Sequence, residues 1–189
     1  MGVVAERRRF TVDEYHKLAT AGVLSADDRV ELVEGELIQL PPIGSLHAGL
    51  VARLDRTFQA LASNDCAVWI RNPLSFPPAS EPQPDVALLK PRVDGYLGAL
   101  PTAMDVLLVI EVADTTVAHD RDVKIPLYAR QGVAEAWLFD ATERRLEIYR
   151  DPGPEGYRTL LRPDRDAVVA PLALPKVRVD IRALFTGIP

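Results

Sequence analysis

Two short runs of apolar positions mark the middle of the chain, Val106 to Ile110 and Ala136 to Phe139. Both runs contain β-branched or aromatic residues and neither contains a charged residue, which is typical of strands buried on both faces of a sheet. From Leu46 to Ala62, by contrast, apolar side chains recur at helical spacing, which predicts a helix with one buried face. We therefore expect two central strands of one sheet, with this helix packed against them.

The rest of the pattern also alternates between helices and strands. Thr11 precedes Glu14 with the spacing of a capping box, which predicts a first helix from Thr11 to Thr20. Polar and apolar positions alternate from Arg29 to Leu40, and Gly35 within this stretch favours a hairpin or a bulge. Further short elements are predicted as strands at Cys66–Ile70, Val86–Leu89, Arg145–Arg150 and Tyr157–Leu161, and as a last helical turn at Asp180–Phe185.

Length and composition fit one domain over residues 1–189, with residues 1–9 as a flexible N-terminal arm. No apolar run approaches the roughly 20 residues that cross a bilayer, and the charges near the N-terminus are not followed by the apolar core of a secretory signal. The single cysteine, Cys66, excludes an internal disulfide and a cysteine-rich zinc site. We expect a cytoplasmic protein that does not associate with membranes.

The formal net charge of −5 weakens any expectation of non-specific affinity for a polyanion. Nucleic acid stays open as a partner, because a local basic patch or bound cations can dominate such a contact. Arginines occur at Arg7–Arg9 and throughout the last third of the chain, although a single arginine is most often solvated surface.

Acidic residues adjoin three of the strand-like stretches, and a lysine follows the third. Glu111 ends the run at 106–110, Asp85 stands directly before a shorter run, and Glu31 lies in the alternating stretch. A carboxylate in such a place is costly to bury unless a cation or hydrogen bonds compensate it. Three converging carboxylates favour a divalent cation, and an oxygen-rich set favours Mg²⁺ or Mn²⁺. With Lys124 nearby, such a site could orient a water and stabilise charge at a phosphorus, which predicts a metal-dependent phosphodiesterase.

Each of these residues also has a plainer structural explanation. Asp85 could cap a turn by accepting hydrogen bonds from nearby amides. Lys124 could form an ordinary salt bridge with Asp120, which shares its face of a helix at this spacing. Pro126 requires that such a helix begin close to it or kink. His47, at the start of a predicted helix, is more often a capping or surface residue than part of a site.

Several motifs point to one family. They are VELVEGEL, His47, PDVAL, IEVAD and the block DRDVK-PLYARQGVAEAWLFD. From roughly Arg9 to Phe185 the sequence resembles the Uma-two family, a large bacterial family of proposed endonucleases with the restriction-endonuclease-like PD-(D/E)xK fold. The resemblance implies an α/β fold, in which a mixed central sheet is flanked by helices and carries an acidic site on its central strands.

The family pattern implies a role for each acid. Asp85 stands where the family has the aspartate of its PD motif, Glu111 stands where it has its second acid, and these two would hold the metal. The lysine that usually follows two residues later is replaced by Ala113, which shares a strand face with Glu111. The family's DxxxK motif, Asp120 to Lys124 here, implies that the lysine has moved to the next segment. The resemblance thus implies Asp85, Glu111 and Lys124 as catalytic residues. The converging acids add Glu31 to this set and predict Mg²⁺ or Mn²⁺ as the cofactor.

The implied function is a Mg²⁺-dependent endonuclease that hydrolyses phosphodiester bonds of nucleic acid, with DNA as the expected substrate. Two other functions stay open: a degenerate member that binds nucleic acid or a protein without cleaving, which the acidic charge supports, and a metal-dependent hydrolase of another phosphoester. Tyr128, Trp137 and the apolar segments of the last third offer more hydrophobic surface than one sheet face needs. Because nucleases that cut both strands often pair two sites about a two-fold axis, we also expect a homodimer.

Overall fold

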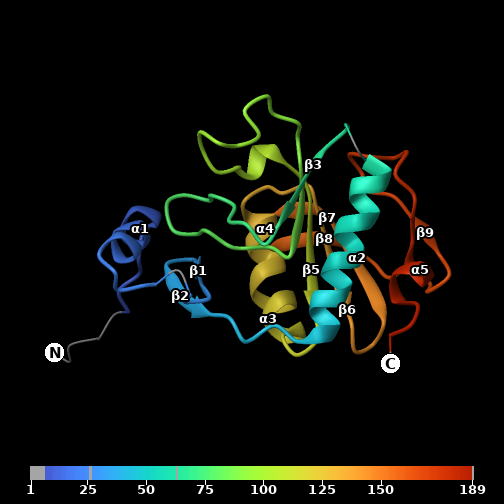
Figure 1. Cartoon of the computed structure of the whole chain (residues 1–189), viewed down its shortest axis with the longest axis horizontal. Coiled ribbons are helices and arrows are strands. Elements are labelled where there is room, and N and C mark those ends of the chain that lie inside the picture. Colours follow the sequence, from blue (N-terminus) through green and yellow to red (C-terminus); the bar gives the residue numbers. More distant parts are fainter. Residues whose placement is uncertain (1–6, 26, 63, 189) are drawn as a thin grey trace.

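A computed structural model describes residues 7–25, 27–62 and 64–188, which are built around one six-stranded sheet (Figure 1). Its order in space is β3-β4-β5-β6-β7-β8. The strands are β3 (Ala67–Ile70), β4 (Val86–Leu89), β5 (Val106–Ala113), β6 (Glu135–Asp140), β7 (Arg145–Gly153) and β8 (Gly156–Leu161). Strands β5 and β6 run parallel, and every other neighbouring pair in this sheet is antiparallel. The sheet is therefore mixed, and the two runs predicted to be central strands form its middle.

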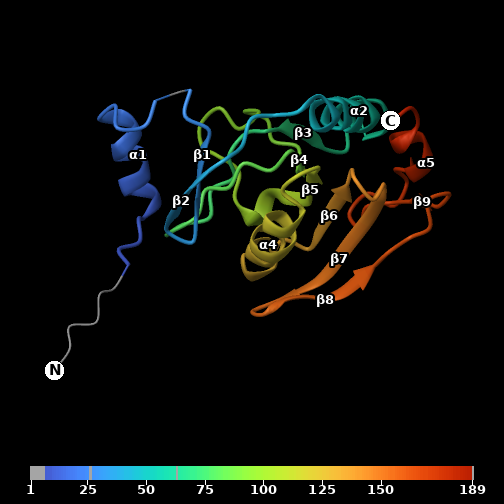
Figure 2. The same cartoon turned by 90° about the horizontal axis from the view of Figure 1, so that it is seen from below.

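Helices cover both faces of the sheet (Figure 2). On one face α2 (Ser45–Ala62) and α5 (Ile181–Phe185) pack against the core cluster that contains Phe58 and Trp137. On the other face α4 (Ile125–Arg130) packs against a second cluster that contains Tyr128. The central strands are apolar on both sides because each side faces a helix layer. The predicted packing of the helix at 46–62 against the sheet is confirmed.

The N-terminal part adds a helix and a hairpin beside the main body (Figure 1). The capping box at the start of α1 (Val12–Thr20) is formed, because Thr11 and Glu14 exchange hydrogen bonds between side chain and backbone. Strands β1 (Val30–Val33) and β2 (Glu36–Gln39) form an antiparallel hairpin. Its turn residues Glu34 and Gly35 have φ values of 49° and 83°, as a two-residue turn of type I′ requires.

The parallel pair β5 and β6 requires a crossover connection. Three consecutive helical pieces supply it: α3 (Val117–His119), a π-helix (Asp120–Lys124) and α4. The remaining short elements are a 3₁₀ turn at Ala103–Asp105 and the antiparallel pair β9 (Val168–Val169) and β10 (Val179–Asp180). The crossover therefore carries the polar DxxxK motif over one face of the sheet.

Of the expected N-terminal arm, residues 1–9, the first six residues lie outside the described part of the chain, and residues 7–9 lie within it. In the described part, Arg8 donates to Glu14 at 2.6 Å and Arg9 donates to the carbonyl of Glu34 at 2.8 Å. Residues 8 and 9 thus lie against α1 and the hairpin. In the part of the chain that the structure describes, no helix is both long and apolar enough to cross a membrane.

Two aromatic residues that were expected to provide spare hydrophobic surface do not provide it. Tyr128 and Trp137 are both fully buried, on opposite faces of the sheet, because the sheet is covered on both sides. The exposed large apolar side chains of the last third are instead Leu160, Leu161, Val168 and Leu172.

Candidate functional site

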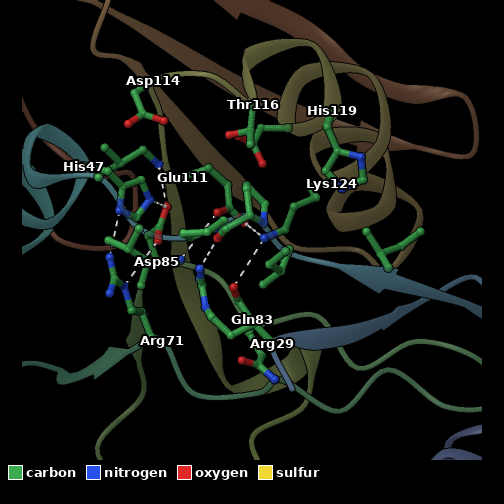
Figure 3. Close-up of a pocket in the computed structure, with 18 of the residues that line it drawn as sticks. Arg29, His47, Arg71, Gln83, Asp85, Glu111, Asp114, Thr116, His119 and Lys124 are labelled. Carbon is green, nitrogen blue, oxygen red and sulfur yellow. Dashed lines mark hydrogen bonds and ion pairs between the residues drawn. The ribbon is translucent and has the colours of Figure 1, made fainter. Parts of the chain in front are cut away.

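Asp85 and Glu111 lie next to each other because β4 and β5 are antiparallel neighbours. Val86 pairs with Ile110, which places Asp85, the residue before β4, beside Glu111. The backbone N–H of Asp85 points to Oε2 of Glu111 at 3.4 Å, and the N–H of Val112 donates to Oδ2 of Asp85 at 2.9 Å. The two acids predicted for the site are thus brought together at the edge of two adjacent strands (Figure 3).

A histidine and an arginine support Asp85. Nε2 of His47, in the first turn of α2, lies 2.9 Å from Oδ2 of Asp85. Arg71 donates to Nδ1 of the same ring at 2.7 Å, so the hydrogen of the ring is on Nε2 and is donated to Asp85. The side chain of His47 is only 14% exposed. His47 is therefore part of the site rather than a surface residue.

Glu111 is buried and contacts two donors through one oxygen. The hydroxyl of Tyr128 donates to Oε1 at 2.5 Å, and Nζ of Lys124 lies 2.8 Å from the same atom. Burial raises the pKa of Glu111 to about 8; Lys124 opposes this rise and the nearby Asp85 adds to it. Loss of Lys124 would consequently favour the protonated carboxyl group.

Lys124 lies between two buried carboxylates. Its Nζ is 2.8 Å from Glu111 and 3.5 Å from Glu31, and it donates to the carbonyl of Gln83 at 3.3 Å. Burial alone would lower the pKa of this ammonium group, but the carboxylates, Glu111 and Glu31 foremost, raise it above its ordinary value. Burial would raise the pKa of Glu31, yet Lys124 and the N–H of Gln83, which donates to Glu31 at 3.0 Å, lower it. Glu31 therefore helps to keep the lysine charged.

The π-helix places Lys124 in the site. Its wide turn buries both ends of the DxxxK motif, Asp120 and Lys124. Thr116 donates to Asp120 at 2.6 Å, whereas the shortest ion pair of Lys124 among the described residues is with Glu111. The plainer explanation, an ordinary salt bridge between Asp120 and Lys124, does not describe this geometry. Pro126 lies in the first turn of α4, where its missing N–H is tolerated.

Ala113 does not leave an opening for a cation on β5. It lies on the same face as Glu111 but is fully buried in the core cluster under α4, and it does not line the cavity described below. The ammonium group reaches Glu111 from the neighbouring segment instead, as the DxxxK motif implied.

A cavity of about 460 Å³ lies over these side chains. Part of its lining is polar and includes His47, Arg71, Asp85, Glu111 and Lys124. Much of the rest comes from residues 38–44, which are the end of β2 and its connection to α2. Glu31 is not part of the lining, so of the four predicted catalytic residues three face the cavity and Glu31 contacts Lys124 behind them.

The donors in the cavity suit a hydrated hard cation. Within residues 7–25, 27–62 and 64–188, no group of three or more His, Cys, Asp or Glu side chains is arranged to hold a metal. Mg²⁺, however, commonly keeps several waters and needs only one or two carboxylates, which Asp85 and Glu111 supply. Nε of Arg71 and Nε2 of His119 are buried beside the cavity and form no hydrogen bond within the described chain. Asp85 and Glu111 thus fit a Mg²⁺ or Mn²⁺ ion that keeps most of its waters. The two nitrogens leave capacity for water or an anionic ligand.

Sequence reasoning missed four residues of the site, and three of them, Arg71, Gln83 and His119, carried no clear signal. Arg71 directly follows β3, and in the sequence it does not differ from an ordinary surface arginine. Gln83 contacts the site through its backbone N–H and C=O groups, so the identity of its side chain gives no signal. For Tyr128 a signal existed, because it follows Lys124 at a spacing that places both on one helix face. That relation predicts that Tyr128 and Lys124 can approach the same carboxylate.

Comparison with known proteins agrees with the fold and with the motifs. A family model, Uma2, described as a putative restriction endonuclease, matches residues 12–182. Among solved structures, a putative nuclease belonging to DUF820 from Anabaena variabilis ATCC 29413 has a TM-score of 0.75 and 19% sequence identity, over 95% of this chain and 99% of that one. No curated protein matches. The predicted resemblance and the predicted mixed sheet flanked by helices are both confirmed.

Proposed function

Because the chain belongs to the Uma2 family, whose model carries the description of a putative restriction endonuclease, we propose that it hydrolyses phosphodiester bonds within DNA with the help of Mg²⁺ or Mn²⁺. One observation supports this proposal most. Lys124 lies 2.8 Å from Glu111, and Asp85 lines the same cavity. Two carboxylates for a hard cation and an ammonium group fixed beside them are the parts that phosphodiester hydrolysis needs.

In this proposal Asp85 and Glu111 hold the cation. When bound, the cation would lower the pKa of a water and offset charge on the phosphate. His47 keeps the carboxylate of Asp85 in one orientation, and Tyr128 does the same for Glu111.

Lys124 acts as a fixed positive charge. The carboxylates around it raise its pKa, so it stays protonated at neutral pH. A protonated lysine cannot remove a proton from water, but it can donate a hydrogen bond to the attacking water or to a phosphate oxygen. Its contribution is therefore electrostatic stabilisation of the charge that develops during hydrolysis. Glu31 supports this role by keeping the ammonium charged.

The experiment uses circular DNA, because only internal cleavage linearises or nicks a circle. Supercoiled plasmid and circular single-stranded DNA are incubated with Mg²⁺, with Mn²⁺ and with EDTA. We expect cleavage that requires the cation and that falls by about a hundredfold or more in Glu111→Gln. Glu143→Gln, at a side chain that is 60% exposed, is the matched control.

Two outcomes would contradict the proposal and select an alternative. Binding of nucleic acid without cleavage of any form would favour the non-cleaving module. Cation-dependent activity on small phosphodiesters alone would favour a hydrolase of another phosphoester.

The proposal includes a homodimer. The exposed leucines Leu160 and Leu161 lie on β8, an edge strand of the six-stranded sheet, and Val168 and Leu172 follow closely in the sequence. An edge strand with apolar side chains is suited to pairing with a second copy of itself.

A further inference from the structure

The proposed catalytic groups lie inside the cavity rather than on an open face. The side chain of Asp85 is 14% exposed, and those of Glu111 and Lys124 are 2% and 4% exposed. A phosphodiester therefore meets these groups only if it enters the cavity. The volume of about 460 Å³ lies within the range of pockets that enclose a small ligand, so only a short piece of a strand fits.

One part of the cavity lining consists of residues 38–44, the end of β2 and its connection to α2, which we call the 38–44 wall. Most of its side chains are apolar, in the sequence IQLPPIG. Arg29 holds it at two points, because the N–H of Leu40 donates to the carbonyl of Arg29 at 2.7 Å and the guanidinium of Arg29 donates to the carbonyl of Pro41. The two adjacent prolines restrict the backbone further. The wall is therefore held in place as it runs from the hairpin to α2 (Figure 1).

An apolar wall beside a phosphodiester site fits a substrate whose base faces are free. In a duplex the bases stack on one another, whereas in a single strand they can pack against protein side chains. The substrate that fits this cavity is thus a strand that is not paired at the point of cleavage.

We propose that the site takes unpaired nucleic acid, either a single strand or a locally opened duplex, with its bases against the 38–44 wall. The inference rests on the proposed nuclease function and narrows its substrate.

The cationic side chains of the cavity suit a strand whose phosphates are bound inside the cavity. Arg29, Arg71 and His119 line the cavity together with the acids. Nε of Arg71 and Nε2 of His119 form no hydrogen bond within the described residues, although they lie 3.6 Å from Asp85 and 3.9 Å from Glu31. Such donors suit phosphate oxygens. The whole chain carries a net charge of −5, which weakens long-range attraction to any nucleic acid. Affinity then comes mainly from contacts inside the cavity.

The first test compares three matched DNA substrates: a labelled single strand, the same strand paired with its complement, and that duplex with a central unpaired bubble. Cleavage is measured in Mg²⁺, and binding is measured by fluorescence anisotropy in Ca²⁺. We expect the single strand to be cut and bound at least about tenfold better than the duplex. The bubble should restore cleavage within its unpaired region. Equal cleavage or equal binding of the intact duplex would overturn the inference, as would failure to bind the single strand.

The second test changes the wall. Ile43 is 40% exposed, so its substitution leaves the core intact. Ile43→Ser removes the apolar side chain, and Ile43→Glu also adds a charge; we expect them to weaken single-strand binding by about threefold and about tenfold or more. Leu97→Ser and Leu97→Glu are the controls, at a side chain that is 93% exposed and outside the cavity lining. If the substitutions at Ile43 and at Leu97 changed single-strand binding equally, the 38–44 wall would not be a contact surface for the strand.

The two proposals can fail separately. If the protein cuts no DNA at all, the nuclease proposal fails. The anisotropy measurements still decide the inference, because selective binding of the unpaired strand that Ile43→Glu removes would support it, and unselective binding would overturn it.

Discussion

Nε2 of His47 lies 2.9 Å from Oδ2 of Asp85, which connects the first turn of α2 to the start of β4 through one carboxylate. Because Arg71 occupies the other ring nitrogen, the imidazole has one tautomer and one orientation. The helix that covers the sheet therefore also orients the acid of the PD motif.

Replacing His47 should weaken metal binding. In His47→Ala, Asp85 loses the hydrogen-bond donor that fixes its orientation. Loss of such a partner of a metal ligand typically lowers metal affinity by about 10- to 100-fold. Calorimetry with Mn²⁺ measures the change. His16→Ala is the control, because His16 pairs with Glu81 outside the cavity. An unchanged affinity in His47→Ala would show that Asp85 does not depend on the histidine.

Replacing Lys124 should separate activity from metal binding. Lys124→Met removes the fixed charge, so cleavage of circular DNA should fall by about a hundredfold or more. Affinity for Mn²⁺ should persist, because an ammonium group is not a ligand. Full cleavage activity in this variant would exclude the catalytic role.

The same substitution should also lower stability. Without the ammonium group the buried Glu31 loses its cation and Glu111 favours its protonated form, so the free energy of unfolding should fall by about 3 kcal/mol or more. Chemical denaturation measures this loss, with Lys176→Met at an exposed position as the control. Equal stability of the two variants would mean that the buried carboxylates do not need the lysine.

Metal affinity should rise with pH. The pKa of Glu111 is raised to about 8 by burial, so below that pH a cation must displace a proton from the carboxyl group. Between about pH 6 and about pH 8 the dissociation constant for Mn²⁺ should decrease, by at most about tenfold per unit, and level off above this range. Calorimetry in buffers with different ionisation enthalpies should detect the released proton. A flat affinity over this range would be inconsistent with a protonated Glu111.

Removing the hydroxyl of the buried Tyr128 should cost more stability than removing that of Tyr157, which is only partly buried. Tyr128 donates to a carboxylate, so Tyr128→Phe should lower the free energy of unfolding by about 1.5–3 kcal/mol. In Tyr157→Phe the lost acceptor is the neutral carbonyl of Val133, and about 0.5–1.5 kcal/mol is expected. Denaturation curves of both variants measure the two losses of unfolding free energy. A larger loss in Tyr157→Phe than in Tyr128→Phe would contradict the prediction.

The proposed homodimer should depend on the edge of the sheet. Light scattering should give twice the mass of one chain for the wild type, and Leu161→Glu should reduce it to one chain because a charge would enter the interface. A wild-type mass of one chain at micromolar concentration would contradict the proposal.

The sequence predicted the parts of the fold and site that follow from a continuous pattern. The runs at 106–110 and 136–139 are central strands because both of their faces are apolar, and a strand delivers the acid at its end to a defined edge. The neighbouring positions of Asp85 and Glu111 follow from the pairing of β4 with β5. The order of residues made Lys124 a candidate, and the family resemblance implied its catalytic role.

Other parts of the site depend on contacts between distant segments and leave no local pattern. The hydrogen bond from Arg71 to His47 joins the end of β3 to α2, and neither residue differs locally from an ordinary surface residue. Tyr128 was mistaken for spare surface because an aromatic side chain on a helix says nothing about what its hydroxyl contacts. The π-helix at Asp120–Lys124 was not predicted either, since five residues are too few to distinguish its period from that of an α-helix.

That π-helix links the geometry of the site to the number of residues in the crossover. Asp120 and Lys124, at its two ends, are both buried, and Lys124 lies 2.8 Å from Glu111. A one-codon deletion inside Asp120–Lys124 would leave an α-helical crossover that can still connect β5 to β6. Asp120 and Lys124 would remain on one face, but one position closer together, so the contacts of Lys124 with Glu111 and of Asp120 with Thr116 would have to form again in a narrower turn. The length of this segment, and not only its composition, therefore matters to a descendant that keeps the site.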